Sequence, residues 1–291
     1  MPVGEAGTAD RGNLISRRDF VRSAGAVGVA TVLLTAKGFQ PPRLYQVTEH
    51  VRPVRGLRQR TRAAFLTDLH LGPYLDAEDL ARWVSSAIDL EPDLVLLGGD
   101  IVDSRYRGDL TGLVRQLSRL TAPLGVHAVL GNHDHSRFRR LDPLLEALDA
   151  AGVRLLLNGS ERVREDLVLA GIDDLRVGRP DVQAALGSAE ELGAAGTEGD
   201  PALVFLSHNP DVIPEMPRSP DLLLAGHTHG GQVRLPLIGA VVTSSRYGRR
   251  YLDGWVRAPM PAFVSRGLGV TGVPFRYDCP AELVHLVLEP A

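Results

Sequence analysis

The sequence predicts an α/β fold in which helices cover β-sheets and a metal site lies at the strand ends. Two features of the 291-residue chain carry this prediction. Short apolar runs alternate with segments of helical periodicity, which is typical of sheets covered by helices. Side chains that can bind metal follow directly after these runs, and in such folds ligands bind beyond the carboxyl ends of the strands.

Five apolar runs end in this way, and each is short enough to be a buried strand. The runs and the residues after them are 63–67 with Asp68 and His70, 94–99 with Asp100, 126–131 with Asn132, His133 and Asp134, 203–207 with His208, and 222–226 with His227 and His229. A single polar strand end is commonplace, as a helix cap or a satisfied core residue. Five of them together favour one shared site.

The last of these segments reads Gly226-His227-Thr228-His229-Gly230-Gly231. On an extended segment, positions i and i+2 point to the same side, so we expect both imidazoles to face one site. The flanking glycines allow backbone angles and close approaches that a larger residue would forbid. Taken alone, the segment is equally well explained as a polar loop that contains two histidines.

The segments between the first runs predict helices. Residues 76–90 carry apolar side chains at a 3.6-residue period after Asp76, which is a favourable helix cap. Residues 110–120 and 138–150 have a similar pattern.

The remaining segments predict further strands and one long loop. We expect an edge strand over 44–51, strands over 153–157 and 167–171 joined by a turn near Asn158-Gly159, a loop over 187–201, and closing strands over 261–267 and 282–288.

The composition is that of an ordinary soluble globular protein, with 44% hydrophobic and 23% charged residues. The net charge of −3 provides no basic field, so we expect no specific binding of nucleic acid. The single cysteine, Cys279, excludes an intramolecular disulfide and cannot by itself form a thiolate zinc site.

The first 38 residues predict an export signal. Residues 1–15 have the composition of a disordered segment. The pair Arg17-Arg18 stands before a modestly apolar run at 23–36, and this order resembles a twin-arginine signal. The alternative is an ordinary arginine pair at the start of a surface helix. Both cleavage of the signal and its retention as an anchor remain open.

The order of the five strand-end motifs is similar to that of the calcineurin-like metallophosphoesterase family. The resemblance covers residues 62–288, and together with the twin-arginine start, Gly230-Gly231-Gln232 and residues 265–269 it points to the exported YkuE/YaeI-like subgroup. It implies an αββα sandwich in which two mixed β-sheets pack together between helices. The implied organisation is a signal region at 1–38, a linker or edge strand at 39–61 and a metallophosphoesterase domain at 62–291.

Carried over by motif, the resemblance also implies two metal ions. Asp68, His70 and His229 would hold the first ion, while Asn132, His208 and His227 would hold the second. Asp100 would bridge them. Oxygen and imidazole ligands suit iron, manganese or zinc.

The implied reaction is hydrolysis of a phosphate ester by a metal-bridged hydroxide. His133 would assist the leaving group, and Asp134 would orient His133. A phosphodiester, a phosphomonoester or a lipid-linked pyrophosphate fits this chemistry equally well. A scaffold that has lost hydrolysis and a nuclease are the alternatives.

The implied surroundings lie outside the cytoplasm. The twin-arginine resemblance implies the Tat export machinery as a partner, and the subgroup makes a lipid or cell-envelope substrate and a peripheral association with the membrane attractive. Four arginines after strand ends are candidates for holding a phosphate, and the sequence does not choose among them: Arg105, Arg137, Arg234 and Arg266.

Overall fold

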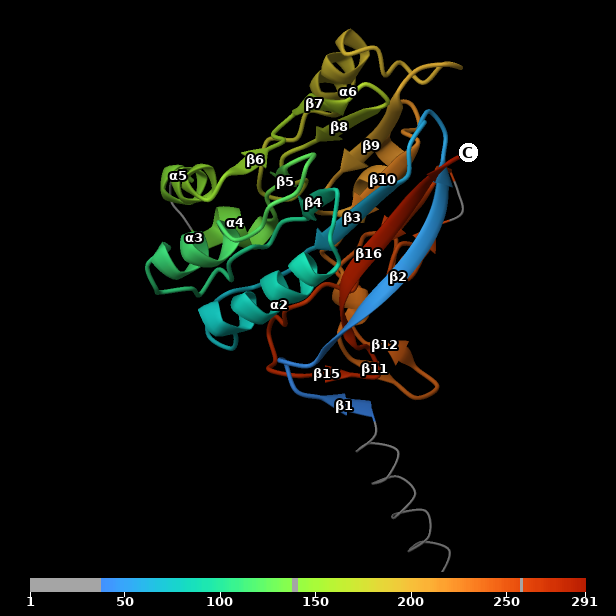
Figure 1. Cartoon of the computed structure of the whole chain (residues 1–291). Coiled ribbons are helices and arrows are strands. Elements are labelled where there is room, and N and C mark those ends of the chain that lie inside the picture. Colours follow the sequence, from blue (N-terminus) through green and yellow to red (C-terminus); the bar gives the residue numbers. More distant parts are fainter. Residues whose placement is uncertain (1–37, 138–140, 257–258) are drawn as a thin grey trace, which may run out of the picture. The chain divides into compact units, whose positions relative to one another are not determined.

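Two six-stranded sheets make up most of the fold in a computed structural model that describes residues 38–137, 141–256 and 259–291 (Figure 1). The chain divides into two units, Met1–Phe39 and Gln40–Ala291, and both sheets belong to the second. The predicted twin-arginine segment lies outside the described residues. Among those residues, no helix has the length and hydropathy needed to span a membrane.

The first sheet has the strand order β2-β16-β3-β4-β5-β6. Its strands are β2 (Tyr45–Val54), β16 (Ala281–Pro290), β3 (Thr61–Leu66), β4 (Leu94–Leu97), β5 (Val126–Ala128) and β6 (Val153–Leu155). β16 runs parallel to β2 and antiparallel to β3, whereas β3 to β6 are all parallel. The sheet is therefore mixed, and β2 forms its edge.

The second sheet has the order β13-β14-β10-β9-β8-β7 and is mixed as well. Its strands are β13 (Gly254–Val256), β14 (Ala262–Val264), β10 (Leu222–Ala225), β9 (Ala202–Leu206), β8 (Leu167–Gly171) and β7 (Gly159–Arg164). The strands β14, β10, β9 and β8 are parallel, and the outer strands β13 and β7 are antiparallel to their neighbours.

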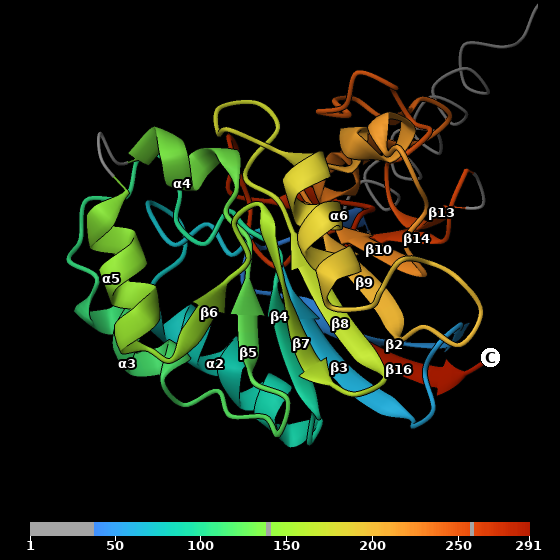
Figure 2. The ribbon, with the colours of Figure 1, turned by 90° about the horizontal axis from the view of Figure 1, so that it is seen from above.

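Strand side chains alternate between two core layers, as the period of a β-strand requires. In β3, Ala63 and Phe65 pack in the layer between the two sheets, while Ala64 and Leu66 pack under the helices. β10 in the second sheet alternates in the same way between the middle layer and the layer under α6. The predicted αββα sandwich is confirmed (Figure 2).

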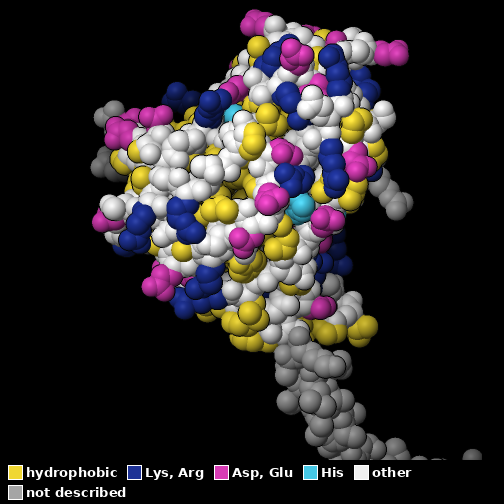
Figure 3. All heavy atoms as spheres, viewed as in Figure 1, with side chains coloured by type: hydrophobic (Ala, Val, Ile, Leu, Met, Phe, Trp, Pro, Cys, Tyr) yellow, Lys and Arg dark blue, Asp and Glu magenta, His cyan; other side chains and the backbone are white. Residues whose placement is uncertain are grey.

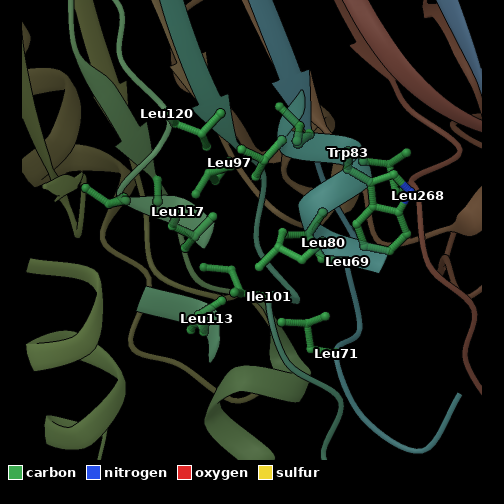
Figure 4. Packing of buried hydrophobic residues seen from close by; sticks show 14 of the residues in the cluster. Leu69, Leu71, Leu80, Trp83, Leu97, Ile101, Leu113, Leu117, Leu120 and Leu268 are labelled. Atoms are coloured by element: carbon green, nitrogen blue, oxygen red, sulfur yellow. The ribbon is translucent and has the colours of Figure 1, made fainter. Parts of the chain in front are cut away.

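Helices cover the outer face of each sheet. Those on the first sheet are α2 (Ala77–Asp89), α3 (Thr111–Leu117) and α5 (Asp142–Ala150), and their leucines form a core with Trp83 and Leu97 (Figure 4). The second sheet is covered by α6 (Val182–Glu191) and the 3-10 helix η1 (Pro210–Glu215).

Helix α2 begins where the sequence predicts. The Asp76 side chain accepts N–H bonds from Glu78 and Asp79, and the Asp79 carboxylate accepts the N–H of Asp76 in return. This reciprocal box satisfies backbone donors that the first helical turn leaves unpaired. The apolar stripe that includes Leu80 and Trp83 is buried against the sheet.

Two predictions for the middle of the chain are wrong. The strands β6 and β8 do not form a hairpin, because they belong to different sheets and the chain passes from the first sheet into the second at Asn158 (φ 57°). The partner of β8 is β7, which follows that turn. The predicted loop over 187–201 begins inside α6, whose buried stripe starts earlier, at Ala185.

Short elements complete the described part of the chain. They are α4 (Asn132–Arg137), the 3-10 helix η2 (His229–Gly231), β1 (Phe39–Gln40), β11 (Arg234–Leu235), β12 (Gly239–Ala240) and β15 (Arg276–Tyr277). β11 and β12 form an antiparallel hairpin.

Candidate metal centre

Strands from both sheets deliver the seven predicted ligands to one place. The first sheet supplies Asp68 and His70 after β3, Asp100 after β4 and Asn132 after β5, and the second sheet supplies His208 after β9 with His227 and His229 after β10. The two aspartates and four histidines of this set are buried. The carboxyl ends of parallel strands thus meet at the site, as expected for a sheet covered by helices.

One group of ligand atoms comes from Asp68, His70 and His229, and these atoms all lie within 4.8 Å of one another. His70 Nε2 is 2.9 Å from His229 Nε2, and His229 Nε2 is 3.4 Å from Asp68 Oδ1. Both imidazoles therefore turn their Nε2 atoms toward the centre of this group.

A second group comes from Asp100, His208 and His227. His208 Nε2 lies 3.2 Å from Asp100 Oδ2 and 3.2 Å from His227 Nδ1. The same Asp100 oxygen is 3.4 Å from His70 Nε2, so Asp100 lies between the two groups.

The donor atoms fit transition-metal ions. Asn132 Oδ1 is buried and has no hydrogen-bond partner among the described residues, which leaves it available as a ligand. Two ring nitrogens of His70 and His229 at 2.9 Å can share only one proton if both rings are neutral. Imidazole and oxygen donors without thiolate suit iron, manganese or zinc.

Backbone carbonyls set the tautomers of two histidines in favour of metal binding. The Nδ1 of His208 is 2.8 Å from the Gly98 carbonyl, and the Nε2 of His227 is 3.1 Å from the Ser244 carbonyl. A ring N–H in such a contact donates a hydrogen bond to the carbonyl, so in the neutral ring the other nitrogen carries no proton and can bind a metal. In His208 this nitrogen is Nε2, which faces Asp100. In His227 it is Nδ1, which faces His208 Nε2.

Burial and neighbouring charges shift the pKa values of the histidine ligands in different directions. Burial alone would lower the pKa of His208, but the charge of Asp100 outweighs it and raises that pKa to about 10. Burial and the charge of His208 lower the pKa of His227 to about 3. Burial also takes the pKa of His229 well below its ordinary value, with charge from His70 and Arg276 acting in the same direction.

His133 lies beside the ligands His70 and Asp100, and its ring is half-buried. Its ring centroid is 4.6 Å from that of His70, and its main-chain N–H donates to Asp100 Oδ1 at 2.7 Å. The Nδ1 atom accepts the N–H of Ser104 at 3.2 Å, so in the neutral ring the proton is on Nε2. Burial lowers the pKa of His133. His133 can thus present a neutral N–H donor next to the metal ligands.

The structure corrects the role expected for Asp134. Its carboxylate accepts the N–H groups of Gly131 and Val102, at 2.9 and 3.0 Å, and therefore fixes the loop rather than the ring of His133. Burial and the charge of Asp100 raise the pKa of Asp134 to about 6. The carboxylate next to the ring is that of Asp103, whose Oδ2 is 3.6 Å from His133 Nδ1 and 3.7 Å from His70 Nδ1.

Sequence reasoning missed Asp103, although a signal was present. Asp103 follows Asp100 by three residues in one loop, and this short spacing places a second carboxylate near the first. Burial raises its pKa, but the nearby imidazole of His70 and the hydrogen bonds that Arg105 donates outweigh this, so the pKa lies well below the usual value. Asp103 is therefore a carboxylate that can orient two of the histidines.

The two histidines of the Gly-His-Thr-His segment reach the site in a different way from that predicted. The segment is not extended, because His227 (φ 70°) and His229 (φ 51°) both adopt left-handed backbone angles. The rings consequently diverge, His227 toward His208 and His229 toward His70.

Three of the four candidate arginines are held by carboxylates. Arg105 pairs with Asp103, Arg234 with Asp253 and Arg266 with Glu282. Guanidinium groups that the sequence did not single out reach the ligands instead. Nη1 of Arg176 is 3.5 Å from His227 Nε2, and Nη2 of the buried Arg276 is 3.3 Å from His229 Nδ1. Arg176 lies in the segment after β8, and only the fold brings it to the site.

Comparison with known proteins agrees with this geometry. The model of the calcineurin-like phosphoesterase family matches residues 61–231. The chain is 29% identical to the uncharacterized metallophosphoesterase YkuE of Bacillus subtilis, over 94% of this chain and 98% of YkuE. It is 28% identical to the phosphodiesterase YaeI of Escherichia coli, over 94% of this chain and all of YaeI.

Solved structures have lower similarity. A dimetal phosphatase from Danio rerio superimposes with a TM-score of 0.45 at 14% identity, over 75% of this chain and 88% of that one. A 5'-nucleotidase precursor from Thermus thermophilus gives a TM-score of 0.45 at 15% identity, and this chain covers half of its length. From the family match, the chain belongs to the calcineurin-like phosphoesterases and is a phosphoric ester hydrolase.

Proposed function

We propose that the chain hydrolyses phosphate esters at a centre of two metal ions. Asp68, His70 and His229 would hold one ion, and Asn132, His208 and His227 the other. Asp100 would bridge them. The observation that carries this proposal is the convergence of the two aspartates and four histidines in two buried groups that meet at Asp100 Oδ2.

Each part of the chain then has a defined task. When bound, the metal ions supply Lewis-acid chemistry, since they generate a nucleophile from water and stabilise charge on the phosphoryl oxygens. His133 presents its Nε2 proton to the oxygen of the leaving group, because its Nδ1 is occupied by the Ser104 N–H. Arg176 stands beside His227 and can donate to a phosphoryl oxygen.

The Asp100→Asn variant tests the bridging role. We expect hydrolysis of bis-p-nitrophenyl phosphate by manganese-, iron- or zinc-loaded protein to fall by more than about 100-fold in kcat/KM, because even partners that only orient a ligand are worth about 10–100-fold. The metal content, measured by elemental analysis, should fall with it.

The matched control is Asp89→Asn, which makes the same change on an exposed residue at the end of α2. An Asp100→Asn protein that keeps the activity of the control would overturn the assignment. A wild-type protein that binds metal but hydrolyses no ester would instead be a metal-binding scaffold.

We also propose that the chain is exported by the twin-arginine route. The support is the order of Arg17-Arg18 and the apolar run at 23–36. Replacing both arginines by lysine keeps the charge, and it should leave the protein in the cytoplasm while the wild type reaches the cell envelope. Equal export of both proteins, measured by cell fractionation, would refute the proposal.

A further inference from the structure

Two cavities lie beside histidines of the candidate metal centre. One of about 450 Å³ includes His229, and one of about 610 Å³ includes Arg176, which touches His227. The segment 242–244 separates them, because Val242 and Ser244 line both. The two cavities therefore adjoin each other, and each lies next to a different histidine of the ligand set.

The first cavity is apolar. Apart from His229, much of its wall consists of Val233, Val241, Val242, Val273 and Phe275. Thr228, Gln232, Ser244 and Thr271 also line it, but its surface is mainly apolar and can bury an alkyl chain. We call it the apolar cavity.

The second cavity is polar. Arg176, Asn209, Thr243 and Ser245 are part of its wall. These side chains supply donors and acceptors for a hydrophilic group. The two cavities thus differ in the chemistry they can accept.

The wall of the apolar cavity continues into an exposed apolar hairpin. Val233 and Val241 close the base of the β11–β12 hairpin, with the Val241 N–H donating to the Val233 carbonyl at 3.1 Å. At the tip, Leu237 is fully exposed and Ile238 is 58% exposed. Figure 3 shows hydrophobic surface at the end of the molecule where Figure 1 places β11 and β12. A leucine in full contact with water is unfavourable unless another apolar phase covers it.

One arginine contacts this hairpin, and a second follows it in the chain. Arg249 donates to the carbonyls of Ile238 and Ala240, and Arg250 lies over the ring of Tyr251 at 5.3 Å. Within the described part of the chain, neither guanidinium pairs with a carboxylate. An apolar tip beside unpaired arginines matches an anionic lipid surface, where acyl chains lie beneath negative headgroups.

We propose that the substrate is an amphiphilic phosphodiester taken from an anionic membrane surface, on which the hairpin tip docks. This inference rests on the proposed hydrolysis at the metal centre. The alkyl chain of the substrate lies in the apolar cavity, and its hydrophilic group lies in the polar one. Hydrolysis adds one water across a P–O bond, so that one arm leaves as an alcohol and the other keeps a phosphomonoester.

Chain length tests the substrate class. With the metal-loaded wild type, we compare ethyl p-nitrophenyl phosphate with dodecyl p-nitrophenyl phosphate, below the concentration at which the latter forms micelles. The dodecyl ester should have a kcat/KM at least about ten-fold higher, because burial of a few methylenes provides that much. Rates equal within about two-fold would overturn the substrate class. Failure to hydrolyse either ester would instead refute the proposed function.

A paired charge change tests the docking surface. The double variant Leu237→Glu/Ile238→Glu should lose at least about ten-fold in flotation with vesicles of phosphatidylcholine and phosphatidylglycerol in equal parts. The control Val47→Glu/Val51→Glu makes the same change on exposed valines of β2, away from both cavities, and should bind like the wild type. Equal melting temperatures establish that both variants are folded. Unchanged vesicle binding by the hairpin variant would overturn membrane docking and leave the tip as a contact for another protein.

Discussion

The backbone at five of the candidate ligands adopts left-handed angles. The φ values are 54° for Asp68, 48° for His70, 49° for Asp100, 70° for His227 and 51° for His229. Each non-glycine residue in this region costs of order 1–3 kcal/mol and persists only where its surroundings hold it. Here the loops hold one another, since the N–H groups of Asp68 and His70 donate to the carbonyls of Gly99 and Asp100.

Glycines permit the close packing of these loops. A Cβ at Gly131 would overlap the carboxylate of Asp100, and a Cβ at Gly226 would overlap that of Asp68. The glycines before these two ligand segments therefore give the carboxylate of a different strand the space it occupies.

Substitution of His133 tests its role at the leaving group. His133→Gln should lower kcat for bis-p-nitrophenyl phosphate by about 10²–10⁴-fold, the range typical of a lost general acid. The content of bound metal should stay at the wild-type level, because the ring is not among the seven ligands. The same variant assayed with an ester of a much more acidic alcohol should lose less, since such a leaving group needs no proton. A uniform loss for all esters would speak against the role.

At the scale of elements, α4 is placed by an ion pair outside the ligand set. His135 of α4 lies 2.6 Å from Asp173 in the segment after β8, and its side chain is largely buried. The helix carries Asn132 and His133, and the segment after β8 carries Arg176. The pair thus joins two elements that present different groups to the centre.

This ion pair predicts a pH dependence of stability. The hydrogen bond and charge of Asp173 raise the pKa of His135, with burial opposing them. The contribution of the pair is therefore complete below the ordinary histidine pKa of about 6.5 and is lost as the pH rises through the higher pKa of the folded state. The wild type should be more stable than His135→Asn near pH 6, and the difference in melting temperature should shrink toward pH 9. A difference that is constant or grows with pH would contradict the ion pair.

At the scale of the whole molecule, the metal centre joins the two sheets. The first sheet supplies Asp68, His70, Asp100 and Asn132, and the second supplies the other three ligands. Bound ions would therefore oppose separation of the sheets as well as serve the reaction. Without them, two carboxylates are held in a buried cluster of imidazoles.

Removal of the metals should therefore lower the stability of the whole domain. A ligand at 100 times its Kd adds about 2.7 kcal/mol to the free energy of unfolding, so dialysis against a chelator should lower the melting temperature by several degrees. Readdition of manganese or zinc should restore it. The Asp100→Asn variant should respond less, and an equal response would show that the ions stabilise the protein elsewhere.

The sequence by itself determined the class of fold and the candidate ligands. Both depend on local patterns: short apolar runs, the cap at Asp76, and metal-competent residues placed directly after the runs. The predictions of secondary structure from the sequence are wrong where a local pattern is compatible with two structures. Asn158-Gly159 is a hairpin signal, yet the turn there passes between sheets, and residues 187–191 complete a helix that starts earlier.

Only the tertiary structure decided which groups surround the ligands. Asp103 rather than Asp134 stands beside His133, Arg176 rather than the arginines at strand ends reaches His227, and an apolar cavity begins at His229. The physical reason is that a side chain's direction and its distant neighbours depend on how loops from two sheets pack. No spacing along the chain encodes that packing, whereas the spacing does encode which residue ends each strand.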